Sequence, residues 1–135
     1  MSPITSTAPK SRKIIVTSWV LQCLAAAAFL AAGGAKVAGI PMMVATFDHI
    51  GFGQWFRFVT GVVEIAGAIA LLVPAGAASG AIVLAITMFF ATLTHLFLIG
   101  GSPAPAILLM VVTATVAWLR RGTLMSLLSR LESKQ

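Results

Sequence analysis

The sequence predicts an all-α integral membrane protein, folded as an antiparallel four-helix bundle with a short interfacial helix between spans 1 and 2. Three observations predict this class. Only 9% of the 135 residues are charged and 59% are hydrophobic, whereas soluble domains carry about 25% charged residues. The chain from Ile65 to Leu119 has no Asp, Glu, Lys or Arg, and it is too long for one span of about 20 residues. Turn-forming residues divide the apolar sequence, so it must fold back on itself.

The first span is predicted at residues 14–34, after a disordered cytoplasmic N-terminus at residues 1–13. Its length suits one bilayer crossing, and the basic residues Lys10, Arg12 and Lys13 precede it. A cleaved signal peptide would begin in the same way, but its apolar core has only about 7–15 residues. A membrane span is therefore the favoured interpretation.

A short helix is predicted in the linker that follows. Pro41 suits the first turn of a helix, and apolar residues recur along one stripe until Gly51 and Gly53 end it. Such a helix is expected to lie in the membrane interface. Trp55 and Phe56 then form an aromatic anchor at the level of the lipid headgroups.

The remaining three spans are predicted at residues 56–73, 77–99 and 105–119. Residues that stop helices separate them, namely Pro74 to Gly76 and a second stretch rich in Gly and Pro. Because the last span is short, the two arginines behind it are expected to extend to the interface, or the helix to stand nearly upright.

Residues 120–135 are predicted to be a cytoplasmic tail that forms an amphipathic helix on the membrane surface. The net charge of +6 gathers in this tail and before the first span. That distribution argues against a nucleic-acid partner, and the positive-inside rule places both termini in the cytoplasm. We expect a multi-pass protein of the bacterial inner (cell) membrane, in contact with lipid and able to form a homo-oligomer through small-residue faces.

Five polar residues are predicted to converge in the outer half of the bundle: Lys36, Arg57, Thr60, Glu64 and His95. Glu64 is the most informative, because an unpaired carboxylate inside the membrane costs at least ~2.5–3.5 kcal/mol. Lys36 is the expected cationic partner. The five residues are predicted to bind a ligand. In the alternative interpretation, Lys36, Glu64 and His95 only hydrogen-bond one another and fix the helix packing.

Other residues that carry chemistry do not indicate a second site. The single cysteine excludes paired-thiol chemistry, which needs two. The two histidines and the few carboxylates lack metal-ligand spacing, and no catalytic residue is predicted, so whether the protein is an enzyme stays open. Four methionines are interpreted as packing residues or as the lining of an adaptable pocket: Met42, Met43, Met88 and Met110.

Short motifs occur along the chain in a characteristic order: Gly33-Gly34-Ala35-Lys36, Gly39-Ile40-Pro41, the run from Arg57 to Glu64 with Gly67-Ala68 and Leu71-Leu72 behind it, and Thr94-His95-Leu96. By these motifs the segment from Ala25 to Trp118 resembles the DoxX-like family of small four-span membrane proteins. Lys36, Arg57, Glu64 and His95 fall on recurrent polar positions of that family.

The resemblance implies a redox-associated role. Some relatives are the membrane subunit of a thiosulfate:quinone oxidoreductase, others associate with redox-stress proteins, and distant animal relatives assist receptor assembly. For this chain it implies a small apolar ligand such as a quinone, no covalent cofactor, and a redox partner protein. Two other functions stay open. One is a membrane scaffold or assembly factor, and the other is a proton-coupled exporter, although such exporters usually carry their acid in the first span.

Overall fold

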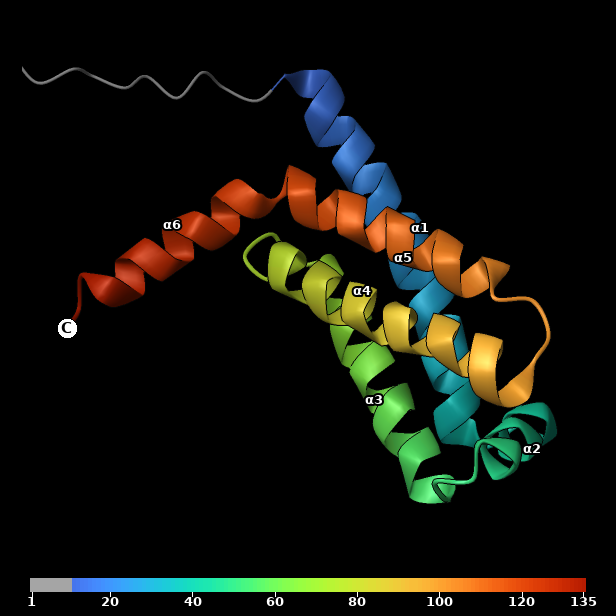
Figure 1. Ribbon diagram of the computed structural model, residues 1–135. Helices are drawn as coiled ribbons and strands as arrows, with labels where there is room; N and C mark the ends of the chain where they lie inside the picture. The colour runs from blue at the N-terminus through green and yellow to red at the C-terminus, as the bar shows by residue number, and fades with distance from the viewer. Residues whose placement is uncertain (1–10) are drawn as a thin grey trace, which may run out of the picture.

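The structure, a computed structural model, describes residues 11–135, so residues 1–10 of the predicted N-terminal segment lie outside the described residues. The described part is built of helices joined by short turns and contains no strand, which confirms the all-α prediction (Figure 1). The elements in order are α1 (Arg12–Ala38), α2 (Pro41–Ile50), α3 (Gln54–Leu71), α4 (Ala77–Thr94), the π-helix η1 (His95–Ile99), α5 (Ala104–Leu119) and α6 (Arg121–Glu132).

Three helices are long and apolar enough to cross a membrane, and a fourth candidate is bent. The three are α1, α3 and the continuous segment of α4 and η1; α5 passes the same test only together with α6, from which a 56° bend separates it. Large apolar side chains cover the outside of these helices, with Leu24 65% and Phe97 78% exposed. An apolar surface of this extent needs lipid as its solvent. The chain is therefore a membrane protein.

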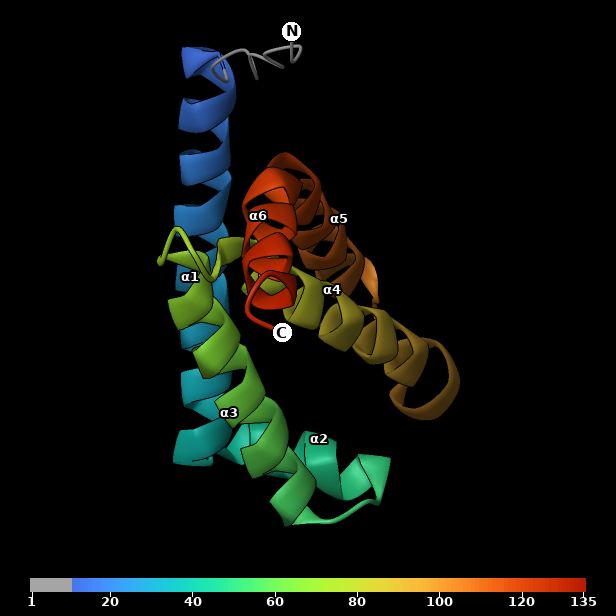
Figure 2. The same cartoon turned by 90° about the vertical axis from the view of Figure 1, so that its left-hand side faces the viewer.

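The long helices form two hairpins. α3 returns along α1, and α5 returns along α4 (Figures 1 and 2). The α4/α5 hairpin is inclined to the first one, with α4 packed on α3 and α5 packed on α1. In four-helix bundles of the predicted kind all helices run nearly parallel or antiparallel, whereas here the two hairpins cross each other (Figure 2). α2 lies at the end where α1 stops and α3 starts.

The first helix continues beyond the predicted end at Gly34. It runs for 27 residues and ends at Gly39, whose φ of 70° is the left-handed conformation that favours glycine. Gly33 does not stop the helix. Its missing side chain instead allows α3 to approach, because a Cβ there would stand 2.8 Å from the carbonyl oxygen of Gly61. The glycine serves close helix packing, as is common in membranes.

The apolar core lies between the two hairpins and separates two polar groups of side chains. Phe29 of α1, Leu71 of α3, Leu84 of α4 and Val116 of α5 are fully buried there. One polar group lies near α2 and forms the candidate site below. The other lies at the opposite end, where α1 meets the end of α5.

This second group contains Arg120, which turns into the protein. Its Nε donates to Ser18 Oγ and to Gln22 Oε1, both at 2.9 Å, and Gln22 Nε2 donates to the Leu71 carbonyl at 2.6 Å. The prediction that both arginines extend to the interface did not include this contact of Arg120 with α1. The hydroxyl of Ser18 and the amide oxygen of Gln22 accept from its Nε, whereas its buried Nη2 has no hydrogen-bond partner among the described residues. The bonds of Arg120 and Gln22 together join α1, α3 and α5.

Replacing Gln22 by leucine is expected to lower the free energy of unfolding in detergent by about 1–3 kcal/mol, because the buried Leu71 carbonyl loses its donor and Arg120 loses an acceptor. Thermal unfolding followed by circular dichroism measures the change. Cys23→Leu is the matched control, since Cys23 is the next residue and is exposed. Equal melting temperatures for the two variants would contradict a stabilising role for this group.

Candidate functional site

The site is built around a buried ion pair between the first and third helices. Lys36 Nζ of α1 lies 3.0 Å from Glu64 Oε2 of α3, with the Lys36 side chain 14% exposed and that of Glu64 2% exposed. Charges in such surroundings are stable only when they are paired and hydrogen-bonded. The partner predicted for Glu64 from the sequence is thus the partner in the structure.

Close packing of the helix backbones makes this contact possible. Gly61 of α3 faces α1, where a Cβ would stand 3.0 Å from the Gly33 carbonyl oxygen and 3.0 Å from Lys36 Cβ. Glu64 follows one turn after Gly61 on the same face of α3. Two small residues therefore set the separation of α1 and α3 at which lysine and glutamate meet.

Arg57 holds the end of α1 and does not line the cavity described below. Its Nη1 donates to the Lys36 carbonyl oxygen, and its Nε donates to Gln54 Oε1 at 2.6 Å. A cation beside the last carbonyls of a helix interacts favourably with the helix dipole. Arg57 is itself only 6% exposed. It thus fixes the backbone of Lys36, the residue that pairs with Glu64.

The short helix α2 is tied to the start of α3. Gln54 Nε2 donates to Asp48 Oδ1 at 2.6 Å and to the Val44 carbonyl at 3.0 Å. The Phe47 and Phe56 rings, one from each helix, pack with their centroids 5.8 Å apart. These contacts place α2 beside the ion pair as one wall of a cavity.

This cavity has a volume of about 890 Å³ and lies between the two hairpins at the α2 end. Four of the five predicted ligand-binding residues line it, namely Lys36, Thr60, Glu64 and His95. Most of the wall is apolar and comes from α1 to α5, including Phe29, Met43, Phe47, Phe56, Met88 and Phe90. Such a volume and lining are typical of sites for small organic molecules.

His95 reaches the cavity from the first residue of η1. Its Nδ1 lies 3.0 Å from the Gly100 carbonyl oxygen. Because a carbonyl can only accept, Nδ1 carries the hydrogen, and whenever the ring is neutral Nε2 is therefore an acceptor. Within residues 11–135, no hydrogen bond joins His95 to Lys36 or Glu64. The purely structural interpretation, with all three bonded to one another, therefore fits only the lysine and the glutamate.

Thr60 presents an oxygen to the same space. Its hydroxyl donates to the Phe56 carbonyl one turn earlier at 2.8 Å. Because the hydrogen is used in that bond, the hydroxyl oxygen can only accept a hydrogen bond from a ligand. The cavity thus combines an ammonium group, a carboxylate, an imidazole acceptor and a hydroxyl oxygen in apolar surroundings.

The cavity reaches the outside of the protein between α3 and α4. Val59 of α3 and Phe90 of α4 both line it, and they are 48% and 60% exposed. The two helices diverge from their connecting turn towards this end (Figure 2). Part of the cavity wall is thus also part of the apolar outer surface.

Sequence patterns did not single out most of the aromatic wall. Of the four methionines interpreted as a pocket lining or as packing residues, Met42, Met43 and Met88 line the cavity, whereas Met110 packs against the apolar core. Phe29, Phe47 and Phe90 carry no signal that separates them from ordinary apolar residues of a span, because their role depends on how the two hairpins are inclined.

Comparison with known proteins gives the family. Residues 20–120 match the model of the DoxX-like family. The chain belongs to this family. YdgD of Bacillus subtilis (strain 168), described as an uncharacterized protein, is 40% identical over 53 residues, which are 38% of this chain and 46% of that protein. The match thus spans less than half the length of this relative. No solved structure matches the chain.

Proposed function

We propose that this DoxX-like membrane protein binds a small apolar ligand such as a quinone between its two hairpins and serves a redox partner protein. The observation that carries the proposal is the cavity of about 890 Å³, in which Lys36, Glu64 and His95 interrupt an apolar wall. A large apolar pocket with a few convergent polar groups is the usual form of a small-molecule site.

The residues present fit the chemistry of a quinone or quinol. The Lys36 ammonium has three N–H donors. Its hydrogen bond to Glu64 uses one of them, and the others can donate to a carbonyl oxygen of the quinone ring. His95 Nε2 and Thr60 Oγ1 can accept from a quinol hydroxyl. The aromatic and methionine side chains suit a flat ring with an apolar tail, and the opening between α3 and α4 suits a ligand that arrives from the bilayer.

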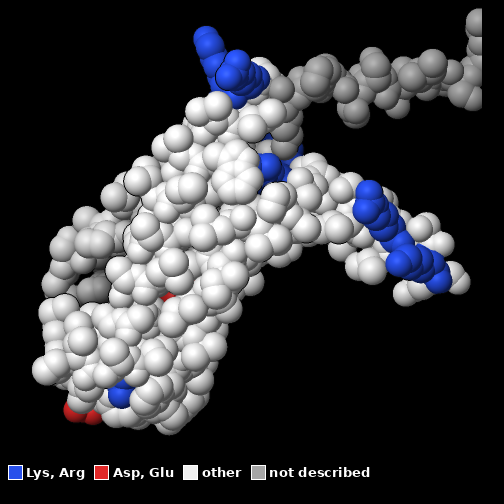
Figure 3. Space-filling model, turned by 180° about the vertical axis from the view of Figure 1, so that it is seen from behind, with Lys and Arg blue, Asp and Glu red and all other residues white. Residues whose placement is uncertain are grey.

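The proposed orientation places this cavity in the outer half of the bacterial inner membrane. In it, α1, α3, α4 with η1, and α5 cross as an antiparallel bundle, while α6 lies on the cytoplasmic surface. The charge distribution supports it: Lys and Arg gather at the start of α1 and along α6, and a largely uncharged surface follows towards the α2 end (Figure 3). By the positive-inside rule, both termini are then cytoplasmic.

Calorimetric titration of the purified protein in detergent with a short-tailed quinone and its reduced form tests the proposal. We expect saturable binding, and about tenfold weaker quinol binding by His95→Leu, because leucine offers no acceptor to the quinol hydroxyl and the hydrogen bond is lost. His49→Leu is the matched control, since His49 is exposed on α2 and does not line the cavity. Heats no larger than those of dilution in the wild type, or equal affinities in the two variants, would refute the proposal.

A scaffold or assembly factor is the second candidate. The ion pair lies beside the contact of Gly33 with Gly61, and Arg57 ties the end of α1 to α3, so the same residues also hold two helices together. In this case the wild type binds no quinone, and substitution of Glu64 changes only thermal stability. The titration above and a melting curve together separate the two functions.

A further inference from the structure

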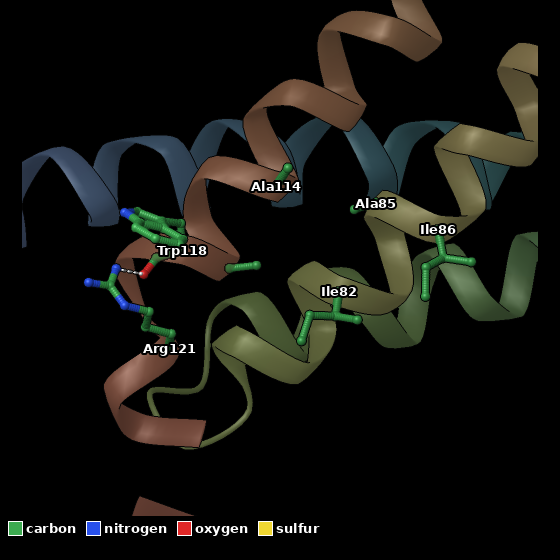
Figure 4. A pocket seen from close by; sticks show the side chains of 7 residues that line it. Ile82, Ala85, Ile86, Ala114, Trp118 and Arg121 are labelled. Carbon is green, nitrogen blue, oxygen red and sulfur yellow. Dashed lines mark hydrogen bonds between the residues drawn. The ribbon is translucent and has the colours of Figure 1, made fainter. Parts of the chain in front are cut away.

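A second hollow lies on the outer surface of the α4/α5 hairpin, away from the ion pair. It has a volume of about 370 Å³ and is lined by Ile82, Ala85 and Ile86 of α4, by Ala114, Ala117 and Trp118 of α5, and by Arg121 at the start of α6 (Figure 4). The alanines leave a slot between the two helices, and its lining is apolar except at the end where α5 meets α6.

The two residues at that end are suited to the boundary between hydrocarbon and headgroups. The Trp118 ring is exposed, and the Arg121 guanidinium lies 4.0 Å from its centroid. Arg121 Nη1 donates to the Trp118 carbonyl at 2.8 Å, which leaves most of the five guanidinium donors for another acceptor. Among residues 11–135 the only ion pair is that of Lys36 with Glu64, so Arg121 has no carboxylate partner there.

We propose that this groove holds one acyl chain of an anionic phospholipid, whose phosphate is bound by Arg121. The apolar slot and the cation at its end match the two parts of such a lipid. A water-soluble phosphate would leave the slot unused. Basic pockets between membrane helices are known to bind anionic headgroups.

Arg120 is not part of this site, although it is the adjacent residue. Its guanidinium bonds to Ser18 and Gln22 and lies 5.1 Å from the Trp19 ring centroid, all on α1. The bend between α5 and α6 thus sends two consecutive arginines to different sides, one into the protein and one to the groove. The inference does not depend on the ligand of the larger cavity.

Native mass spectrometry of the delipidated full-length protein, with either dioleoyl phosphatidylglycerol or dioleoyl phosphatidylcholine added, tests this. We expect the wild type to retain one phosphatidylglycerol in preference to phosphatidylcholine. Arg121→Gln should lower that retention about fivefold, the effect of one basic residue near an anionic lipid surface. Arg130→Gln is the control, because Arg130 is exposed on α6 and does not line the groove.

A second pair of variants tests the slot itself. Ala114→Phe fills it and should reduce retention of phosphatidylglycerol, while Val111→Phe adds the same ring to a lipid-facing position of α5 outside the groove. Equal retention of the two lipids by the wild type, equal effects of the two arginine variants, or equal effects of the two phenylalanine variants would each overturn the assignment.

Discussion

Replacing Gly33 by alanine is expected to destabilise the protein, whereas the same change at Gly34 is expected to be neutral or stabilising. A Cβ at Gly33 would stand 2.8 Å from the Gly61 carbonyl oxygen and 2.9 Å from Ile65 Cγ1, so α1 and α3 must move apart. Overpacking of this kind costs about 1–3 kcal/mol. A Cβ at Gly34 meets nothing within 4 Å, and alanine is up to about 1 kcal/mol better than glycine in a helix.

Thermal unfolding in detergent, followed by circular dichroism, measures both variants against the wild type. The two melting temperatures should move in opposite directions or differ clearly, although the positions are adjacent in the same helix. A Gly34→Ala protein as destabilised as Gly33→Ala would show that helix backbone effects dominate, and the close approach of α1 and α3 would then not be the stabilising feature.

The second large effect concerns the ion pair. Lys36→Met leaves the carboxylate of Glu64, 2% exposed, without its cation, and breaking a buried pair in this way costs about 3–5 kcal/mol. The double variant Lys36→Met with Glu64→Leu removes both charges and should recover most of the lost stability, because apolar residues often replace a buried pair at little cost.

Melting temperatures of the single and double variants form a cycle that isolates the pair. Lys13→Met is the control, since Lys13 lies on the same helix and is exposed. If Lys36→Met melts like Lys13→Met, the pair does not stabilise the fold. The double variant is also informative about function: a stable protein that no longer binds quinone assigns the charges to the ligand, and a stable protein with unchanged affinity assigns them to packing.

The ion pair could be predicted because charge inside a membrane is so costly that few arrangements are allowed. Glu64 lies within a span, so it needs a partner, and the order of the helices left Lys36 as the nearest cation at the same end. The prediction thus rested only on the large free-energy cost of an unpaired charge in the membrane and on the order of the helices. Arg57 was placed in the correct region by the same argument, but its bond to the Lys36 carbonyl was not foreseen.

Features that depend on contacts between distant segments could not be read from the sequence. Gly33 and Gly34 look alike, and only the position of Gly61 reveals that the first is a packing residue within a continuing helix. Arg120 follows an apolar run as an interfacial arginine would, yet it donates hydrogen bonds to Ser18 and Gln22 of α1. Those two residues are four apart on one face of α1, which was a signal for a polar contact.

The unequal lengths of α1 and α5 have a consequence for the lipid around the protein. α1 has 27 residues and α5 has 16, or about 40 Å and 24 Å at 1.5 Å per residue, against a hydrocarbon thickness of about 30 Å. In the proposed orientation we expect the bilayer to thin beside α5, while α1 tilts or emerges on the opposite flank. We expect the annulus of lipid to be asymmetric, with shorter acyl chains enriched on the flank of α5.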